Sequence, residues 1–373
     1  MEPSASPQPQ SNAGNRFVPA RPIKVGVLGA TGAVGQRFVQ LLEGHPWFQV
    51  TALGGSDRSI GKKYGQAAQW RLSPNVPAYA RDITLVEGKP GADWDCDVVF
   101  TSLPAEIAGE VEEEFAAAGY KVFSNSRNHR TDPDVPLMVP EINPDHSAIL
   151  ELQQKQRGWQ EKGGFIVTNP NCTTIHLVLA LKPLQDAFGL KKVMVTSLQS
   201  LSGAGYPGVS ALDIIDNVIP YIGGEEDKVE TEPLKIMGQL ENNRFVDADF
   251  VVSATCTRVA VREAHTESVS VELGRSASLE EVAAALQNWE AEPQRLQLPS
   301  APYRPVLVRS EPDRPQPFYD REGDGAMATT VGRLRRCPIL DYKFVLAGHN
   351  TIRGAAGASI LNAELLVAQG WIK

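Results

Sequence analysis

The sequence of 373 residues contains only four cysteines, and none of them belongs to a C-x-x-C pair. Such scattered thiols exclude a cysteine-based zinc site and a disulfide framework, and they fit a reducing compartment in which a thiol stays free. Lysine and arginine together (36) do not outnumber aspartate and glutamate (44), and the net charge is -8. Nucleic acid is therefore an unfavourable partner, because no surplus of positive charge is available to neutralise phosphates.

Long apolar runs are also missing. No stretch reaches the roughly 18 apolar residues of a membrane-spanning helix, so we expect no membrane partner. The first segment, 1–22, has neither the apolar core of a signal peptide nor the arginine content of a mitochondrial transit peptide. Its Pro, Ser, Gln and Asn residues predict a disordered tail on a cytoplasmic protein. The remaining length exceeds what one core usually fills, about 250–300 residues, and predicts two domains.

The first half of the chain alternates strand and helix patterns. An apolar run, Ile23–Leu28, predicts a buried strand, and a glycine-rich loop and an amphipathic helix follow it. Further strands are predicted at 50–53, 97–103, Lys121–Ser124 and Phe165–Thr168, with a helix at Ala105–Ala118. Strands that alternate with helices predict an α/β fold with a parallel, doubly wound sheet of the Rossmann type.

The pattern changes after about residue 170. The β-branched segments 193–198 and 250–273 predict a mainly antiparallel sheet with one covered face. Ser278 and Glu281 have the spacing of a capping box and predict a helix that runs through Trp289. Residues 291–325 are rich in Pro, Arg, Asp and Gly and predict long loops. The segment 351–371 is helical, and its glycines and alanines would let it pack closely on the first domain.

Three glycines, Gly29, Gly32 and Gly35, lie between the first strand and the first helix. Glycine there permits a tight turn and lets backbone N–H groups approach a pyrophosphate at the helix N-terminus. The same spacing also occurs where glycines serve only the packing of a helix on a strand. The order of strand, loop, helix and strand favours the nucleotide loop.

The end of the second strand indicates which cofactor binds. An enzyme that uses NAD often places an acid there for the ribose hydroxyls. Ser56, Arg58 and Ser59 can hold a 2′-phosphate instead, although Asp57 lies among them. The loop can also be read as a solvated polar turn. We favour NADP.

Cys172 follows a predicted strand and an Asn-Pro-Asn turn, and an apolar helix begins just beyond it. A free cysteine is most often a small core residue. At a helix N-terminus, however, the helix dipole and free N–H groups favour the thiolate, which is the form that attacks a carbonyl carbon. This context favours a nucleophile. His176 falls among apolar positions and is interpreted as a core or interface histidine.

A thiolate needs a partner that exchanges protons, and the other five histidines are candidates. His45 precedes a proline in a predicted turn, His129 and His146 lie in polar loops, and His349 follows a strand. His265 lies in the β-rich second half. The pattern alone does not distinguish one of them.

The chain resembles the aspartate-semialdehyde dehydrogenases, most closely their fungal and archaeal branch, over about residues 23–373. The resemblance rests on ordered motifs that include Gly-Ala-Thr-Gly-x-Val-Gly, Asn-Pro-Asn-Cys-Thr-Thr, Ser-Leu-Gln-Ser-Leu-Ser-Gly-Ala-Gly and Arg-Val-x-Val-Arg-x-x-His-Thr-Glu. Leu-Met-Val-Pro-Glu-Ile-Asn, Gly-Glu-Glu-x-Lys and His-Asn-Thr-Ile-Arg-Gly-Ala-Ala-Gly add to it. The coincidence of these motifs in one order is far more specific than any one of them.

The resemblance implies a role for each matched residue. Cys172 would be the nucleophile, His265 the acid/base and Gln199 the residue that orients the intermediate. The substrate would be held by Arg258 at its carboxylate, Glu225 at its amine, Lys228 and Arg130 at its phosphoryl group, and Asn171. The cofactor would be held by the loop residues and by three later ones, namely Gly29, Thr31, Gly32, Ala33, Val34, Gly35, Ser56, Arg58, Ser59, Ser202, Gly203 and Asn350.

The implied reaction is the NADPH-dependent conversion of β-aspartyl phosphate to L-aspartate β-semialdehyde through a Cys172 thioester. It belongs to amino-acid biosynthesis, on the way to threonine, methionine and isoleucine, with lysine left open. No metal is expected, because N–H groups at the helix start can stabilise the carbonyl oxygen. The implied domains are an NADP-binding one (23–170 with 350–373) and an α+β catalytic and dimerisation one (171–349), in a homodimer or homotetramer.

Two alternatives remain at this point. A related acyl-phosphate or acyl-thioester reductase, acting on N-acetylglutamyl phosphate or malonyl-CoA, would have no use for an amine-binding Glu225. A redox sensor that binds NADP would not turn over. One internal condition also applies: Arg258 and His265 are an odd number of positions apart and would face opposite sides of an unbroken strand. They can line one site only if the strand is interrupted between them.

Overall fold

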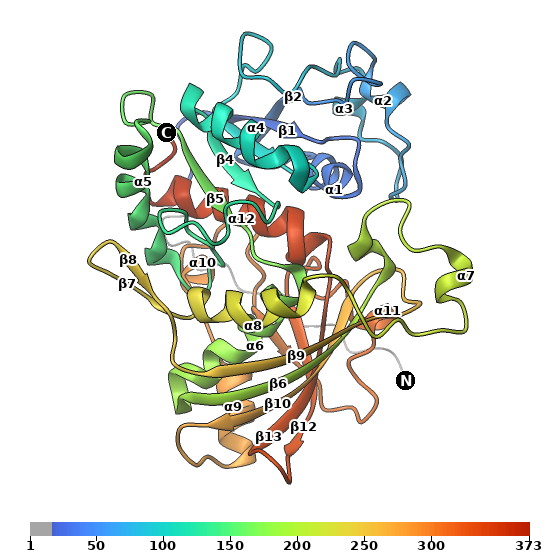
Figure 1. Ribbon diagram of the computed structural model, residues 1–373, viewed down its shortest axis with the longest axis vertical. Helices are drawn as coiled ribbons and strands as arrows, with labels where there is room; N and C mark the ends of the chain where they lie inside the picture. The colour runs from blue at the N-terminus through green and yellow to red at the C-terminus, as the bar shows by residue number, and fades with distance from the viewer. Residues whose placement is uncertain (1–16) are drawn as a thin grey trace.

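The computed structural model describes residues 17–373, so most of the predicted disordered tail lies outside the described residues. Two sheets with their helices lie one above the other, and the C-terminal helix α12 (Gly357–Ala368) runs between them (Figure 1). In the described part of the chain, no helix is long and apolar enough to cross a membrane.

The first sheet has five strands in the order β2-β1-β3-β4-β5, and every pairing is parallel. The strands are β1 (Ile23–Leu28), β2 (Phe48–Leu53), β3 (Val98–Thr101), β4 (Lys121–Ser124) and β5 (Phe165–Thr168). The predicted parallel sheet is confirmed. The strand order changes direction between β1 and β3, and ligands of doubly wound sheets bind at such a point, beyond the carboxyl ends of the strands.

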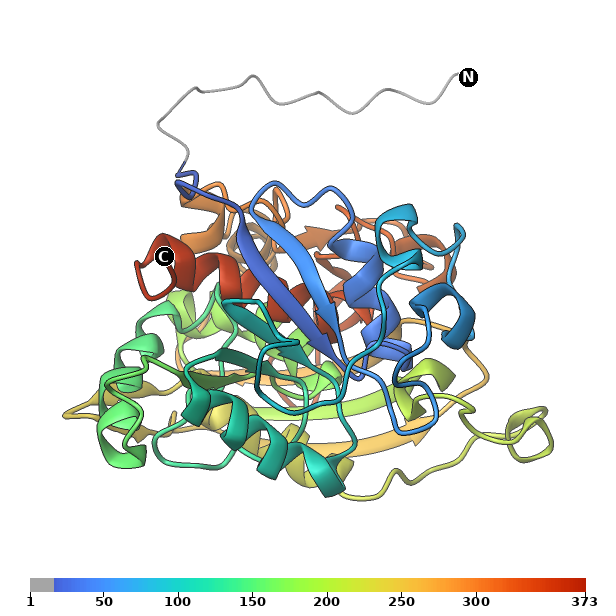
Figure 2. The same cartoon turned by 90° about the horizontal axis from the view of Figure 1, so that it is seen from above.

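Helices cover both faces of this sheet. Helix α4 (Ala105–Ala118), predicted to the residue, packs Phe115 with Val99 and Val122 on one face. On the other face, α1 (Ala33–Leu41) and α12 share a core with β1, in which Phe38 and Leu361 are fully buried. The C-terminal segment therefore does return to the first domain. Figure 2 shows β1 and β2 lying over α12 from above.

The second sheet has six strands in the order β11-β12-β13-β10-β6-β9. They are β6 (Leu190–Gln199), β9 (Val251–Arg258), β10 (His265–Leu273), β11 (Val306–Val308), β12 (Thr329–Arg336) and β13 (Tyr342–Gly348). Its central pairings are antiparallel as predicted, but β6 pairs with β9 and β11 with β12 in parallel. The sheet is thus mixed, because the long connection between β6 and β9 returns the chain in the same direction.

Within residues 17–373, helices cover one face of the second sheet. Helices α6 (Cys172–Phe188), α8 (Glu225–Ile236) and α9 (Leu279–Gln287) pack on it around one apolar core. The capping box of Ser278 and Glu281 is confirmed, although α9 ends before Trp289. The other face exposes apolar side chains, among them Met194 and Val251, which are 53% and 66% exposed.

The remaining elements are short. Those within 291–325 are separated by loops, as predicted for this segment. They are α2 (Tyr64–Ala67), α3 (Ala78–Arg81), η1 (Pro144–Ile149), α5 (Leu150–Arg157), η2 (Leu201–Ala204), α7 (Ala211–Ile214), β7 (Gln239–Glu241), β8 (Arg244–Val246), α10 (Glu292–Arg295), α11 (Pro317–Asp320) and the π-helical turn η3 (Ile352–Ala356). The segment around α7 projects from the body in both views (Figures 1 and 2). It exposes Leu212 (92%), Ile215 (66%) and Tyr221 (67%).

Candidate active site

The site begins where β5 ends and α6 starts, because Cys172 is the first residue of that helix. Asn171 is the N-cap, and its Oδ1 accepts hydrogen bonds from the N–H groups of Thr173 (2.9 Å) and Thr174 (3.3 Å). The cap fixes the cysteine at the helix N-terminus, as the sequence predicts. It also occupies two N–H groups that were expected to hold the substrate oxygen, so that expectation is wrong for these two donors.

Cys172 and His265 meet across the two halves of the chain, with 3.0 Å between Sγ and Nε2. His265 is fully buried, and its Nδ1 accepts a hydrogen bond from the backbone N–H of Ser200 at 3.0 Å. In the neutral ring the proton therefore lies on Nε2 and faces the sulfur. Burial, aided by the nearby positive charges that include Arg258, keeps the pKa of His265 well below its usual value, which favours this neutral form.

Arg258 and His265 lie on one site because the chain turns between them. Arg258 is the last residue of β9 and His265 is the first of β10. Ala264 has φ +80°, and its N–H donates to Asn350 Oδ1 at 2.9 Å. The strand interruption that the sequence required is present.

Arg258 and Gln199 lie at the strand ends next to His265. These two residues are register partners at the ends of β9 and β6. Arg258 Nη1 donates to the carbonyl oxygen of Ser200 at 2.7 Å, which fixes the guanidinium beside the catalytic pair. Gly203 is packed tightly here, since a Cβ on it would lie 2.9 Å from Arg258 Nη1 and 3.0 Å from His265 Cε1.

The first turn of α8 faces the start of α6. Glu225 Oε1 accepts from Asn171 Nδ2 at 2.7 Å, and its Oε2 pairs with Lys228 Nζ at 3.0 Å. Burial raises the pKa of Glu225, but Lys228 and the Asn171 hydrogen bond outweigh it and hold this pKa below its usual value. The carboxylate is thus ionised next to the thiol and can bind an amine.

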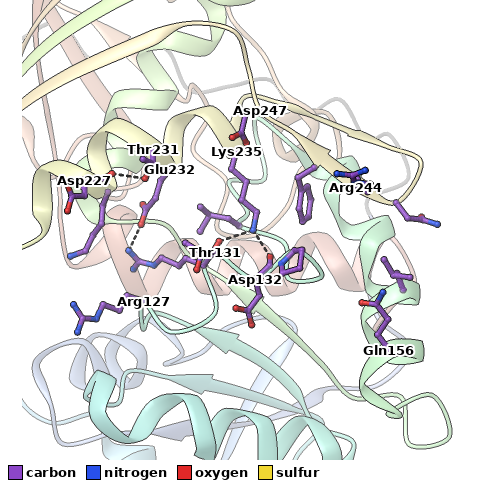
Figure 3. A pocket seen from close by; sticks show the side chains of 17 residues that line it. Arg127, Thr131, Asp132, Gln156, Asp227, Thr231, Glu232, Lys235, Arg244 and Asp247 are labelled. Carbon is purple, nitrogen blue, oxygen red and sulfur yellow. Dashed lines mark hydrogen bonds and ion pairs between the residues drawn. The ribbon is translucent and has the colours of Figure 1, made fainter.

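Arg130 is linked to the start of α6 by Glu232, a residue that was not identified from the sequence. Its Nη1 donates to Glu232 Oε1 at 2.8 Å, a pair that Figure 3 draws as a dashed line from Glu232, and Glu232 Oε2 accepts from the backbone N–H of Asn171 at 2.6 Å. Lys235, one turn further along α8, donates to three carbonyl oxygens of the loop that contains Arg130. The spacing of Glu225, Lys228 and Glu232 on one helix face is the only available signal, and exposed charges show the same spacing.

A separate cleft opens at the point where the strand order reverses. Segments from both domains line it, represented by Thr31, Gly32, Ala33, Ser102, Ser202 and Arg262. Gly29 has φ +71°, and a Cβ on Gly35 would lie 2.1 Å from the carbonyl oxygen of Gly29, so both positions require glycine. Gly32 caps α1 without a side chain, which leaves the helix N-terminus open to a phosphate. These features fit a dinucleotide.

The other predicted cofactor residues differ in position. Ser202 lines the cleft, and its Oγ accepts a hydrogen bond from Asn350 Nδ2 at 2.8 Å. Ser59 Oγ accepts from the N–H of Ser56 and donates to its carbonyl oxygen, so this hydroxyl stabilises the turn itself. Arg58 is exposed. Of the three loop residues, Arg58 is therefore the one whose charged end is available to a 2′-phosphate.

The histidines outside the pair have structural partners. His176 is fully buried with its Nδ1 2.8 Å from Thr329 Oγ1, as expected for a core histidine. His45 pairs with Glu364 and His349 lies 3.6 Å from Glu263. His129 lies in a turn, as expected, although it is buried, whereas the expected loop position of His146 is wrong, because it lies in η1.

The pKa of the Cys172 thiol is shifted in the direction opposite to that expected from its helix position. Loss of solvent, followed by the charge of Glu225, raises the pKa of Cys172 to about 12, although Arg130, Arg258 and the N–H of Thr173 act in the opposite direction. The helix N-terminus is a local effect that falls off within one turn, and the loss of solvent around the sulfur acts against it. This direction opposes the effect of the helix N-terminus, and the protonation state of Cys172 in the free protein stays a prediction.

Alkylation of Cys172 tests this value. With a pKa far above neutral, the thiolate fraction, and with it the rate of reaction with iodoacetamide, should rise about tenfold per pH unit between roughly pH 7 and 9 without a plateau. Peptide mapping must follow Cys172 alone, because Cys337 has a lowered pKa. A plateau below about pH 8 would show that the helix N-terminus dominates after all.

Comparison with known proteins places this geometry in context. Residues 24–149 match a family model described as "Semialdehyde dehydrogenase, NAD binding domain", and residues 181–353 match "Semialdehyde dehydrogenase, dimerisation domain". The aspartate-semialdehyde dehydrogenase of Archaeoglobus fulgidus is 54% identical over 92% of this chain and 98% of its own length. That of Cryptococcus neoformans is 47% identical over 95% of this chain and 100% of its own.

Solved structures agree. The Candida albicans aspartate-semialdehyde dehydrogenase, determined with NADP, is 45% identical and superposes with a TM-score of 0.87 over 94% of this chain and 100% of that one. A second enzyme of this name from Vibrio cholerae is 27% identical, with a TM-score of 0.73 over 93% and 99% of the two chains. The predicted resemblance to archaeal and fungal members is confirmed.

Proposed function

The chain belongs to the aspartate-semialdehyde dehydrogenase family, and we propose that it converts β-aspartyl phosphate to L-aspartate β-semialdehyde with NADPH through a thioester on Cys172. The observation on which this proposal depends most is the 3.0 Å contact between Cys172 Sγ and His265 Nε2, with Arg258 and Glu225 beside it. One carboxylate binder and one amine binder fit the two charged ends of an amino acid. The N-acetylglutamyl-phosphate and malonyl-CoA alternatives have no free amine for Glu225.

The residues act in a fixed order. The Cys172 thiol loses its proton to solvent and attacks the acyl carbon as the thiolate, the bond between that carbon and the phosphate oxygen breaks, and Arg130 and Lys228 hold the departing dianion. The cleft lined by Gly32, Ser202 and Arg262 would hold NADPH, which would supply the hydride that reduces the thioester. His265 shares its Nε2 proton with the carbonyl oxygen while that oxygen is negatively charged, and then with the sulfur as the carbon–sulfur bond breaks. Arg258 and Gln199 hold the substrate in line throughout.

We propose that substrate binding favours formation of the thiolate. The free thiol has a raised pKa, and two positive side chains, Arg130 and Arg258, already act to lower it. Burial is the larger cause of the raised pKa of Cys172 and Glu225 the second; a substrate amine paired with Glu225 balances that second cause, and the N–H of His265 can stabilise the sulfur anion. The enzyme would then be reactive toward its own substrate and inert toward other electrophiles.

Cofactor choice is assigned to Arg58. Arg58→Ala should raise the KM for NADP about tenfold or more and leave that for NAD nearly unchanged, because a charge-assisted hydrogen bond to the 2′-phosphate is lost. Initial rates at varied cofactor concentration measure both constants. Lys62→Ala, which removes a nearby exposed lysine, is the matched control. An equal effect of Arg58→Ala on both cofactors would show that the loop does not bind the 2′-phosphate.

We assign dimerisation to the uncovered face of the second sheet and to the projecting segment around α7. Both expose apolar side chains, and an exposed apolar patch on a folded chain typically marks an interface. A homodimer is therefore proposed, with the predicted limits of the two domains and with a cytoplasmic location that keeps the Cys172 thiol reduced. Light scattering in solution tests the dimer, since a monomeric mass would contradict it.

A rate assay of the purified protein tests the function. With L-aspartate semialdehyde, phosphate and NADP, NADPH should be formed continuously, whereas without phosphate it should not exceed one equivalent of enzyme. A protein that binds NADPH but shows no phosphate-dependent turnover would support the redox-sensor alternative.

A further inference from the structure

Beside the site lies a cavity that α8, α5, the β7–β8 hairpin and the loop 127–133 enclose (Figure 3). Arg130 and Lys228 line it, so the phosphate end of the proposed site opens into this cavity and not into the cofactor cleft. Glu232 lies on its wall and points toward the loop from α8, as Figure 3 shows.

Glu232 contacts both the arginine that is proposed to bind phosphate and the residue that precedes the nucleophile. One carboxylate oxygen is 2.8 Å from Arg130 Nη1, and the other is 2.6 Å from the N–H of Asn171, the residue immediately before the nucleophile. The side chain is only 7% exposed, so these contacts are little weakened by water. The two oxygens thus connect the phosphate-binding arginine to the start of the nucleophile's helix.

The other N–H donors of Arg130 indicate the role of the ion pair between Arg130 and Glu232. Nη2 donates to the carbonyl oxygen of Asn125 at 3.1 Å. Among the described residues, the buried Nε has no hydrogen-bond partner. A buried guanidinium N–H without a partner is unfavourable unless a ligand fills it. Glu232 and Asn125 therefore hold the guanidinium with one N–H reserved for an anion.

We propose that Glu232 is a positioning residue that orients Arg130 toward the phosphoryl group and aligns the Asn171–Cys172 peptide with it. The proposal rests on the proposed function, because it assumes that phosphate binds at Arg130. It explains why a carboxylate stands in an anion site, where it would otherwise repel the substrate. One oxygen of the Glu232 carboxylate pairs with Arg130, and the other accepts a hydrogen bond from the N–H of Asn171 at the start of α6.

Glu232→Gln keeps the size of the side chain but replaces one acceptor oxygen by an N–H₂ donor, so it cannot accept both hydrogen bonds. It should raise the KM for phosphate about ten- to hundredfold, which is the usual loss for a charged hydrogen bond, and it should lower kcat. The Kd for NADP should stay close to that of the wild type. The matched control is Asp227→Asn, which removes the same charge from the same helix and cavity without touching Arg130 or Asn171.

A double-mutant cycle separates positioning from a general structural role. In an Arg130→Ala background, Glu232→Gln should change the phosphate KM no further, because the residue through which it acts is gone. Glu232→Asp, which keeps the charge but is shorter, should give a phosphate KM between those of Glu232→Gln and the wild type, and it serves as the second variant if the glutamine protein does not fold.

Three outcomes are distinguishable. A wild-type enzyme without phosphate dependence would overturn the proposed function and this proposal together. A phosphate-dependent wild type in which Glu232→Gln behaves like Asp227→Asn would overturn this proposal alone. This proposal would also be overturned if Glu232→Gln raised the KM for phosphate by the same factor in the Arg130→Ala background as in the wild type.

Discussion

Cys172→Ala should abolish turnover, lowering kcat by more than about 10⁴-fold, the order of magnitude typical for loss of a catalytic nucleophile. The Kd for NADP should not change, because the cofactor cleft is lined by other segments. Cys172→Ser should keep only a trace of activity, since a hydroxyl ionises far less readily than a thiol. Initial rates and cofactor titration measure these effects.

Cys337→Ala is the control for this substitution. Cys337 follows β12 at the far end of the second sheet from the site, and its loss should leave the rate unchanged. If Cys172→Ala retains a substantial fraction of activity, the sulfur does not form the intermediate.

Arg258→Lys should lower kcat/KM for aspartate semialdehyde about 100-fold, because a displacement of about 1 Å at the reacting carbon can cost that much. Arginine offers a planar pair of N–H donors to a carboxylate, and lysine offers a single point charge. In the structure one donor is already used by the Ser200 carbonyl oxygen, so a shorter group without the fork must give up one of the two contacts. The KM for phosphate should change much less.

The effect of Arg258→Lys must be compared with substitutions at the phosphate-binding end of the site. Lys228→Ala and Arg130→Ala should raise the phosphate KM most and the semialdehyde KM least, and Arg336→Lys, an exposed arginine at the end of β12, should change neither. If Arg258→Lys acted mainly on phosphate, the two ends of the substrate would be bound in the reverse orientation.

Features that depend on neighbouring residues were predictable from the sequence. Asn171 caps α6 from two and three positions away, so the place of Cys172 at a helix start follows from local chemistry. The three glycines of the first loop are equally local. The Ser278 capping box was recognised for the same reason, whereas the exact end of α9 was not, because helix ends fray.

Features that depend on contacts between distant segments were not predictable. His265 could not be told apart from the other histidines because its contact with Cys172 joins β10 to α6. Glu232 was not identified from the sequence, because its contact with Arg130 joins α8 to a loop about 100 residues earlier. The raised pKa of Cys172 has the same origin, since the helix position is visible in the sequence and burial is not.

The thioester on Cys172 is tested most directly by intact-protein mass spectrometry after mixing enzyme, NADP and L-aspartate semialdehyde without phosphate. Without the acceptor that releases the acyl group, the intermediate should accumulate. The account predicts a mass increase equal to one aspartyl acyl group, mapped to the peptide with Cys172, lost on addition of phosphate and absent from Cys172→Ala. Formation of one equivalent of NADPH with no covalent mass change would contradict it.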